Sequence, residues 1–264
     1  GRAISKLTFT LLQQLTKKEL AENIPDAILS QYKLMPRGQA YQQIHFPTSE
    51  QSWQQAERRL KFEELFIAQR RLGRLKIRRH QQSRGWMLEK VGALFNNFYE
   101  HHIPFALTNA QKKVIKEIRQ DTVNGHQMNR LLQGDVGSGK TMVALLIMLL
   151  AVDNGFQACL MAPTEILAQQ HFEAIRDLLK ELPVNICLLT GSVKRKLRKE
   201  ILSSLKEGSL HLLIGTHAII EEEVQFANLG LAIIDEQHRF GVAQRAALWK
   251  KNSTPPHILV MTAT

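Results

Sequence analysis

The sequence predicts an α/β fold, in which a parallel sheet is covered by helices on both faces and is preceded by a mainly helical N-terminal segment. From residue 105 to residue 264, short apolar runs alternate with amphipathic helical patterns, the order found in parallel sheets with helices on both faces. From residue 1 to residue 104 this alternation is absent. We therefore expect two parts, residues 1–104 and residues 105–264.

Each expected strand of the second part is a short apolar run, and each expected helix has a helical spacing of apolar residues. The strands are Arg130–Gln133, Gln157–Ala162, Ile186–Leu189, His211–Ile214, Leu231–Asp235 and Ile258–Met261. The helices are Asn109–Asp121, Gly139–Asp153, Glu165–Lys180, Lys194–Lys206 and Val242–Lys250. In such sheets ligands bind at the carboxyl ends of the strands, so the functional residues are expected there.

The first part reads as helices separated by proline-containing breaks. Short helices are expected at Leu7–Leu20 and Glu22–Tyr32, with breaks at residues 36–38 and 47–49. One or two long helices are expected over Ser52–Arg79. Residues 57–90 hold eleven Lys or Arg and four Asp or Glu, which fits either a solvated helix face or contact with a DNA backbone.

A glycine-rich run lies between the first expected strand and its helix. It consists of Gly134, Asp135, Val136, Gly137, Ser138, Gly139, Lys140 and Thr141. A glycine, four residues and then Gly-Lys-Thr is the pattern of a phosphate-binding loop, although a glycine-rich turn before a buried helix can look the same. Glycines let the backbone approach a phosphate, and the helix start faces the anion. Lys140 would reach the β- and γ-phosphates, and Thr141 would offer its hydroxyl to Mg²⁺.

A pair of carboxylates follows the apolar strand Leu231–Asp235. Asp235 would hold the Mg²⁺ shell, and Glu236 would orient or deprotonate the attacking water. Two adjacent carboxylates alone are more often a solvated strand end. Together with the upstream phosphate-binding loop they indicate a nucleoside triphosphatase.

Composition and charge fit a protein that binds a polyanion. The chain has 35 Lys and Arg against 24 Asp and Glu, a net charge of +11, which favours nucleic acid as a partner or simply aids solubility. Cys159 and Cys187 lie in apolar runs and are expected to be reduced thiols. We find no metal-binding Cys/His cluster, signal peptide or membrane-length apolar run, and expect a cytoplasmic protein with no membrane partner.

Small hydroxyl residues and glycines follow three further strands. Thr164, Gly191, Thr216 and His217 are the members of this series. Each lies at an expected helix or turn start on the same edge of the sheet, where backbone N–H groups and hydroxyls can hold phosphates of a nucleic-acid strand. Taken singly, each is also compatible with an ordinary helix cap.

This series resembles the superfamily 2 helicases and translocases. Residues 163–165 match motif Ia, residues 235–238 match motif II of the DExH type, and residues 262–264 match motif III. The segment from Phe105 to Gln111 is similar to the one whose glutamine reads adenine. The resemblance implies ATP as the nucleotide with Phe105 and Gln111 at its base, His238 as a contact to a second lobe, and Thr262 and Thr264 as coupling residues.

Within that superfamily the chain resembles the bacterial RecG branched-DNA helicases. Residues 59–65, 133–141, 215–220 and 235–245 carry this likeness. The transcription-repair coupling translocases share residues 239–242 but usually have glutamate where this chain has Gln237. The resemblance implies a RecA-like, phosphate-loop motor lobe at residues 105–264 and a helical link at residues 1–104.

The resemblance also implies an ATP hydrolase that moves on forks and Holliday junctions in recombination and repair. Members of this family carry a wedge domain and a second motor lobe, so we expect this chain to be a fragment, weak or inactive alone. Single-strand-binding protein is an implied partner, and a monomer is expected. Two other functions stay open: a fragment that binds nucleotide and DNA without turnover, and, less supported, a phosphate-loop kinase or small-molecule ATPase.

Overall fold

The structure, a computed structural model, describes all residues except 1, 17, 83, 237–250, 252–253 and 264. Its contacts divide the chain into two compact units, Gly1–Arg79 and His80–Thr264. The boundary between these units lies earlier than the one expected after residue 104. Among the described residues, no helix is long and apolar enough to span a membrane.

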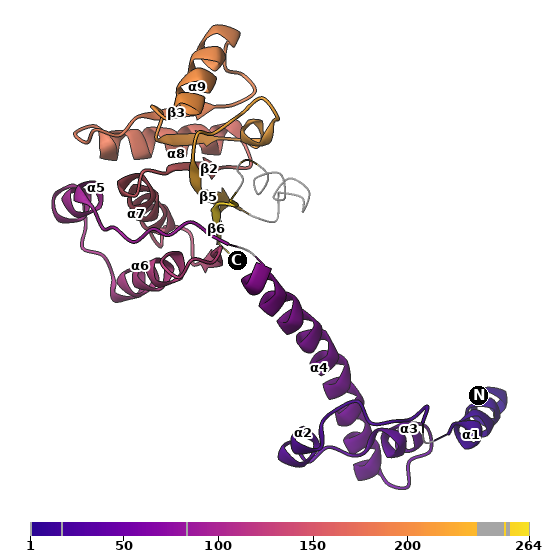
Figure 1. Ribbon diagram of the computed structural model, residues 1–264. Helices are drawn as coiled ribbons and strands as arrows, with labels where there is room; N and C mark the ends of the chain where they lie inside the picture. Colours follow the sequence, from indigo (N-terminus) through magenta and orange to yellow (C-terminus); the bar gives the residue numbers. More distant parts are fainter. Residues whose placement is uncertain (1, 17, 83, 237–250, 252–253, 264) are drawn as a thin grey trace. The chain divides into compact units, whose positions relative to one another are not determined.

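The second unit is built on a parallel sheet (Figure 1). In the described part of the chain its strands are β1 (Asn129–Gln133), β2 (Gln157–Met161), β3 (Ile186–Leu189), β4 (Leu212–Gly215), β5 (Leu229–Asp235) and β6 (His257–Thr262). Their order across the sheet is β1-β6-β5-β2-β4-β3, and every recorded pair is parallel. Strands β2, β5 and β6 are buried along their whole length, as expected for central strands covered on both faces.

Helices cover both faces of this sheet. On one face α6 (Asn109–Thr122), α7 (Lys140–Asp153) and α8 (Glu165–Leu179) share a core with Leu231 and Ile233 of β5. On the other face α9 (Arg195–Glu207) and the 3₁₀ turn η2 (His217–Ile220) pack with Ala232 and Ile234. Successive residues of β5 thus serve opposite cores, the two-residue period of a strand. The RecA-like α/β fold is confirmed.

Residues 80–104 belong to the second unit because they are fastened to the end of α7. The carboxylate of Asp153 accepts hydrogen bonds from the backbone N–H groups of Gly92 (3.1 Å), Leu94 (3.1 Å) and Phe95 (2.8 Å). It therefore caps α5 (Ala93–Asn97), which continues into the π-helical turn η1 (Phe98–His102). The neighbouring Asn154 side chain bonds both the N–H and the C=O of Lys90.

Asp153→Ala is expected to lower the free energy of unfolding of the second unit by about 2–3 kcal/mol, because three backbone donors lose one shared acceptor. Chemical denaturation of the purified chain, followed by far-UV circular dichroism, measures this loss. Asp177→Ala, which removes an exposed carboxylate from α8, is the matched control and should change stability by less than about 0.5 kcal/mol. Equal effects of the two variants would contradict the capping role.

The first unit consists of helices held to one long helix. They are α1 (Arg2–Gln14), α2 (Asp26–Gln31), α3 (Arg37–His45) and the part of α4 (Glu50–Gln82) up to Arg79. Arg59 of α4 is fully buried, and its guanidinium bonds Glu63 of the same helix and Glu22 from the segment before α2. This ion-pair network joins α4 to the segment before α2.

The six predicted strands are confirmed with ends that agree within two residues, and four of the five predicted helices are confirmed. The fifth, Val242–Lys250, lies outside the described residues. The long helix over Ser52–Arg79 is confirmed as a single element, α4. The break predicted at residues 36–38 is wrong, since α3 begins there after Pro36. The helix predicted over Glu22–Tyr32 is shorter than expected and consists of α2 alone.

Candidate functional site

The two predicted nucleotide motifs lie on either side of the carboxyl end of β6. The backbone N–H of Gly134 donates to the carbonyl of Thr262 (3.3 Å), and the N–H of Glu236 donates to the carbonyl of the preceding Met261 (3.0 Å). Consecutive carbonyls of β6 thus hold the glycine-rich loop after β1 and the carboxylate pair after β5. The fold brings together two segments that are far apart in the sequence.

The glycine-rich loop has the backbone conformation that its glycines allow. Gly137 and Gly139 have φ values of 79° and 78°, in the left-handed region. A Cβ atom on Gly139 would also lie 2.4 Å from the Nε2 atom of Gln111, so a side chain at this position would displace the Gln111 amide. Lys140 Nζ donates to the carbonyls of Gly134 (2.5 Å) and Asp135 (2.8 Å) within the loop. A phosphate bound there would accept hydrogen bonds from this ammonium group in place of the two carbonyls.

Gln111 joins the start of α6 to the loop. Its N–H donates to the Thr108 hydroxyl and its Oε1 accepts from the Thr108 N–H, which forms a capping box. Its Nε2 donates to the carbonyl of Ser138 (2.9 Å). Thr108 is therefore the cap of α6, and the Gln111 side chain that completes the capping box also lies against the loop. Phe105 upstream is 48% exposed, which leaves its ring available to a ligand.

The carboxylate pair has one buried and one strained member. Asp235 ends β5, is 9% exposed and lies 2.9 Å, through Oδ2, from Nε2 of His171 on α8. Glu236 has a φ of 53°, an uncommon value for a residue with a side chain, and such conformations are often found at functional sites. His238 and Thr264, predicted for coupling, lie outside the described residues, and Thr262 is buried at the end of β6.

The donor atoms at this edge suit Mg²⁺. Asp235 supplies carboxylate oxygens across the end of β6 from the loop that carries the Thr141 hydroxyl, and Mg²⁺ is usually bound by one or two carboxylates together with substrate phosphates and water. Across the described residues, no group of three or more His, Cys, Asp or Glu side chains is placed to hold a metal by itself. The residues present fit a metal that arrives with a nucleotide.

The residues predicted to contact DNA follow three adjacent strands, β2, β4 and β3. Thr164 is exposed and caps α8, and Gly191 is exposed after β3. Glu165 accepts from the N–H (3.2 Å) and hydroxyl (2.8 Å) of Ser192, which ties these two strand ends together. A cavity of about 430 Å³ lies beside them, lined by α8 and the residues after β3.

The segment after β4 differs from the prediction. His217 is exposed, but Thr216 is only 2% exposed, and its hydroxyl has no hydrogen-bond partner within the described part of the chain. The Thr216 hydroxyl therefore cannot meet a DNA phosphate in this conformation. Contact there would involve His217.

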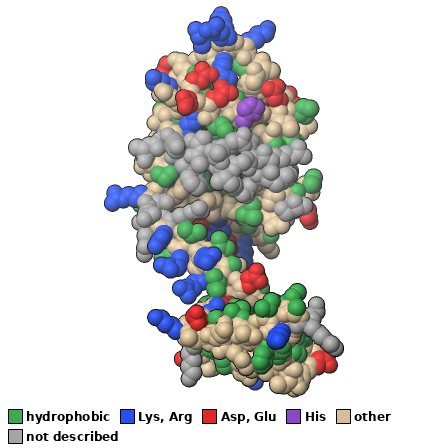
Figure 2. Space-filling view, turned by 90° about the vertical axis from the view of Figure 1, so that its right-hand side faces the viewer, with side chains coloured by type: hydrophobic (Ala, Val, Ile, Leu, Met, Phe, Trp, Pro, Cys, Tyr) green, Lys and Arg blue, Asp and Glu red, His purple; other side chains and the backbone are tan. Residues whose placement is uncertain are grey.

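The start of α9 carries a basic run, Lys194, Arg195, Lys196, Arg198 and Lys199, which is mostly exposed and so available to a polyanion. Figure 2 shows Lys and Arg side chains gathered over the end of the second unit that carries α9. Arg198 is the exception, since its guanidinium is paired with Glu221 (2.5 Å) and Glu223 (2.5 Å). Neutralising Arg198 would therefore disturb the fold as well as the charge.

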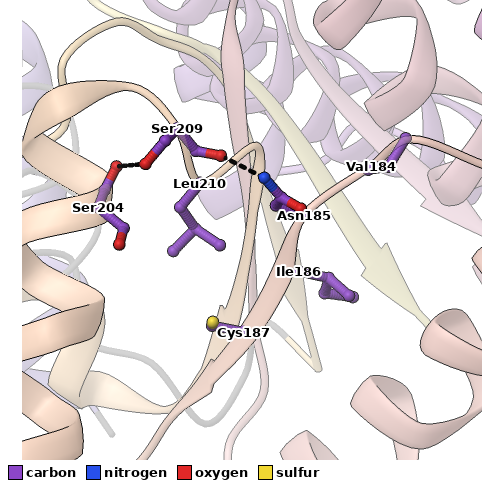
Figure 3. A pocket seen from close by; sticks show the side chains of 7 residues that line it. All are labelled: Val184, Asn185, Ile186, Cys187, Ser204, Ser209 and Leu210. Atoms are coloured by element: carbon purple, nitrogen blue, oxygen red, sulfur yellow. Dashed lines mark hydrogen bonds between the residues drawn. The ribbon is translucent and has the colours of Figure 1, made fainter.

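A further cavity, of about 410 Å³, lies by the edge strand β3 (Figure 3). It is lined by residues that precede or begin β3 and β4, where the Asn185 amide donates to the Ser209 carbonyl (2.8 Å). These are the amino-terminal ends of the strands, opposite the edge where ligands of such sheets bind. Burial raises the pKa of the Cys187 thiol in this cavity, so this thiol is kept protonated. The cavity is separate from the nucleotide motifs.

Comparison with known proteins places these motifs in a family. The model of the DEAD/DEAH box helicases matches residues 108–264, which include the glycine-rich loop and the carboxylate pair. The chain belongs to the DEAD/DEAH box helicase family. The match begins at Thr108, the cap of α6, so the matched segment starts at the helix that carries Gln111.

Individual relatives are RecG helicases. The chain is 50% identical to the ATP-dependent DNA helicase RecG of Streptococcus pneumoniae, over 93% of this chain and 36% of that protein. It is 44% identical to the RecG of Thermotoga maritima, over 93% of this chain and 31% of that protein. A solved structure of RecG bound to a three-way DNA junction superposes with a TM-score of 0.78 at 41% identity, covering 93% of this chain and 32% of that one.

The predicted resemblance to RecG is thus confirmed, and it extends beyond residues 105–264, since the matches cover 93% of the chain. The chain spans about a third of the length of these curated relatives. The structure of the helicase Lhr from Mycobacterium smegmatis, with 19% identity and a TM-score of 0.52, shows the same fold.

The structure places one further residue, His171, against the carboxylate pair, and sequence reasoning missed it. It lies on the stripe of α8 that also carries Ala168 and Ile175, both fully buried. A histidine at a helix spacing that otherwise holds buried apolar residues was the available signal.

Proposed function

We propose that this chain is the nucleotide-binding motor lobe of an ATP-dependent helicase or translocase that acts on branched DNA. The observation that carries the proposal is the arrangement at β6, whose two consecutive carbonyls hold the glycine-rich loop and the carboxylate pair on either side of the strand end. The names of the relatives support DNA as the polymer, and the three-way junction in one solved relative supports branched DNA as the substrate.

Each residue of the nucleotide site has a role in this proposal. The loop from Gly134 to Thr141 cradles the phosphates with its backbone N–H groups, and Lys140 neutralises them. Gln111 binds the adenine edge, with Phe105 beside it. Asp235 and Thr141 would hold Mg²⁺, which supplies charge neutralisation on the phosphates. Glu236 orients and deprotonates the attacking water.

The other predicted roles are also part of the proposal. DNA lies along the strand ends marked by Thr164, Gly191 and His217, and Thr262, Thr264 and His238 couple the nucleotide state to DNA and to a second lobe. We also propose a cytoplasmic monomer with single-strand-binding protein as a partner, on the family resemblance alone.

The experiment is ATP hydrolysis by this chain with and without a three-way DNA junction, together with Mg-ATP binding measured with a fluorescent ATP analogue. Lys140→Ala is expected to weaken binding at least about tenfold, because removing a charge-assisted contact to phosphate costs about 1.5–3 kcal/mol. The matched control is Lys112→Ala, an exposed lysine of α6 next to Gln111, which should bind as the wild type does.

The outcomes separate a motor lobe that is active alone from a fragment that binds nucleotide without turnover. Turnover that rises with junction DNA and is lost in Lys140→Ala supports a motor lobe active by itself. Binding without turnover supports a nucleotide-binding half that needs other parts of the full-length protein. Wild-type nucleotide binding in Lys140→Ala contradicts the proposed site.

A further inference from the structure

A histidine from a neighbouring helix contacts the carboxylate assigned to Mg²⁺. Nε2 of His171 lies 2.9 Å from Oδ2 of Asp235, and both side chains are nearly buried, with 15% and 12% of their surface exposed. An ionised carboxylate only accepts hydrogen bonds, so His171 donates from Nε2. The contact joins α8 to the end of β5 across 64 residues of sequence.

His171 is placed by the packing of its helix. It occupies the same face of α8 as Ala168 and Ile175, which are fully buried against the sheet. Because packing fixes Ala168 and Ile175, about one turn before and one turn after His171, the imidazole has little freedom to turn away from Asp235. A polar ring in an apolar stripe requires a partner, and the Asp235 carboxylate is that partner.

We propose that His171 is a positioning residue that fixes the Asp235 carboxylate for the metal of a bound nucleotide. The bond to Oδ2 sets the rotation of the carboxylate and lets Oδ1 serve the metal or its water shell. Outer groups that orient a ligating side chain typically change metal affinity by about 10–100-fold when removed. This inference rests on the proposed function, because it needs Asp235 to serve Mg²⁺.

The helix that carries His171 also reaches the edge of the sheet assigned to DNA. The same helix begins at Thr164 and Glu165, and Glu165 is bonded to Ser192 after β3, along the edge assigned to DNA. The first turn of α8 therefore lies at the edge of the sheet assigned to DNA, and a later turn of the same helix contacts the Asp235 carboxylate. Loss of the His171 bond should weaken the effect of Mg²⁺ on nucleotide binding without altering the DNA edge itself.

The test compares His171→Phe, which keeps the ring volume and removes the donor, with His171→Gln, whose amide nitrogen can donate from a similar place. Binding of a fluorescent ATP analogue is titrated with Mg²⁺ and, separately, measured in EDTA. In His171→Phe the Mg²⁺ concentration for half-maximal binding is expected to rise about tenfold, with metal-free affinity unchanged. His171→Gln is expected to restore most of the wild-type Mg²⁺ dependence.

A control and the contrary outcomes complete the design. His101→Phe changes an exposed histidine outside the site and should leave both measurements unchanged. If His171→Phe has the wild-type Mg²⁺ dependence, or if both substitutions lower metal-free binding equally, the positioning role is refuted while the nucleotide site stands. If the wild-type chain shows no Mg²⁺-dependent nucleotide binding, the proposed function fails and this inference fails with it.

Discussion

Glu236→Gln is expected to lower DNA-stimulated ATP hydrolysis by the full-length protein by about 10²–10⁴-fold, the usual contribution of a general base. The substitution keeps the size of the side chain and removes the charge that accepts a proton from water. Glu236 follows the buried end of β5, its N–H is held by the Met261 carbonyl, and its φ of 53° fixes it in a left-handed conformation. The backbone therefore directs the side chain at position 236 in the same way whether it is glutamate or glutamine.

Nucleotide affinity separates Glu236→Gln from Lys140→Ala. The first variant should bind Mg-ATP within about threefold of the wild type, since an interaction used only in the transition state changes the rate and not the ground-state affinity. Stopped-flow phosphate release measures the rate, and equilibrium titration with a fluorescent ATP analogue measures the affinity. Glu173→Gln, an exposed carboxylate of α8, is the control for a neutralised charge. Hydrolysis at the wild-type rate in Glu236→Gln would exclude Glu236 as the base.

The sheet and the nucleotide motifs were predictable because each depends on a local pattern. The strands are apolar runs with clear ends, and buried strands such as β5 follow such runs closely. The loop from Gly134 to Thr141 is recognisable because few other segments combine glycines, a lysine and a threonine at the spacing that phosphate and Mg²⁺ binding require. Parallel strands end at the same edge, so the position of Asp235 and the loop at one edge of the sheet followed from the fold class.

Three features were not predictable, each for a physical reason. α3 begins after Pro36, which suits the non-helical cap position because proline fixes φ, but the same residue reads as a break in a pattern search. The capping of α5 by Asp153 joins residues about 60 apart, and the contact of His171 with Asp235 joins residues 64 apart. Long-range side-chain contacts depend on register and helix rotation, which composition and periodicity do not fix.

The first unit depends on a buried charge network that is recognisable only in three dimensions. Arg59 is fully buried, with Nη1 bonded to Glu63 Oε2 (2.7 Å) and Nη2 to Glu22 Oε1 (2.5 Å). Arg37 at the start of α3 pairs with the other Glu63 oxygen (3.2 Å). Burial raises the pKa of Glu22, but backbone N–H donors, Arg37 first, and the charge of Arg59 together lower it below its usual value. Two arginines and two glutamates thus join α3, α4 and the segment before α2.

Arg59→Met is expected to destabilise the first unit by about 3–5 kcal/mol, because it leaves the nearly buried Glu63 carboxylate without its main partner. Hydrogen exchange followed by mass spectrometry on peptides from α2, α3 and the first half of α4 measures local opening and should show faster exchange there, with the sheet unchanged. Lys61→Met removes an exposed ion pair with Glu57 on the same helix and should have an effect below about 1 kcal/mol.

The double variant Arg59→Met/Glu63→Met shows whether the loss comes from the unpaired charge or from the missing bonds. Replacing both partners of a buried ion pair by apolar side chains is often neutral or stabilising by about 1–4 kcal/mol, whereas removing one partner is not. The double variant is therefore expected to exchange more slowly than Arg59→Met in the peptides of α4. It should not fully regain wild-type protection, because Glu22 and Arg37 also lose a partner. If the double variant exchanges faster than the single one, the hydrogen bonds themselves, and not the uncompensated charge, stabilise this unit.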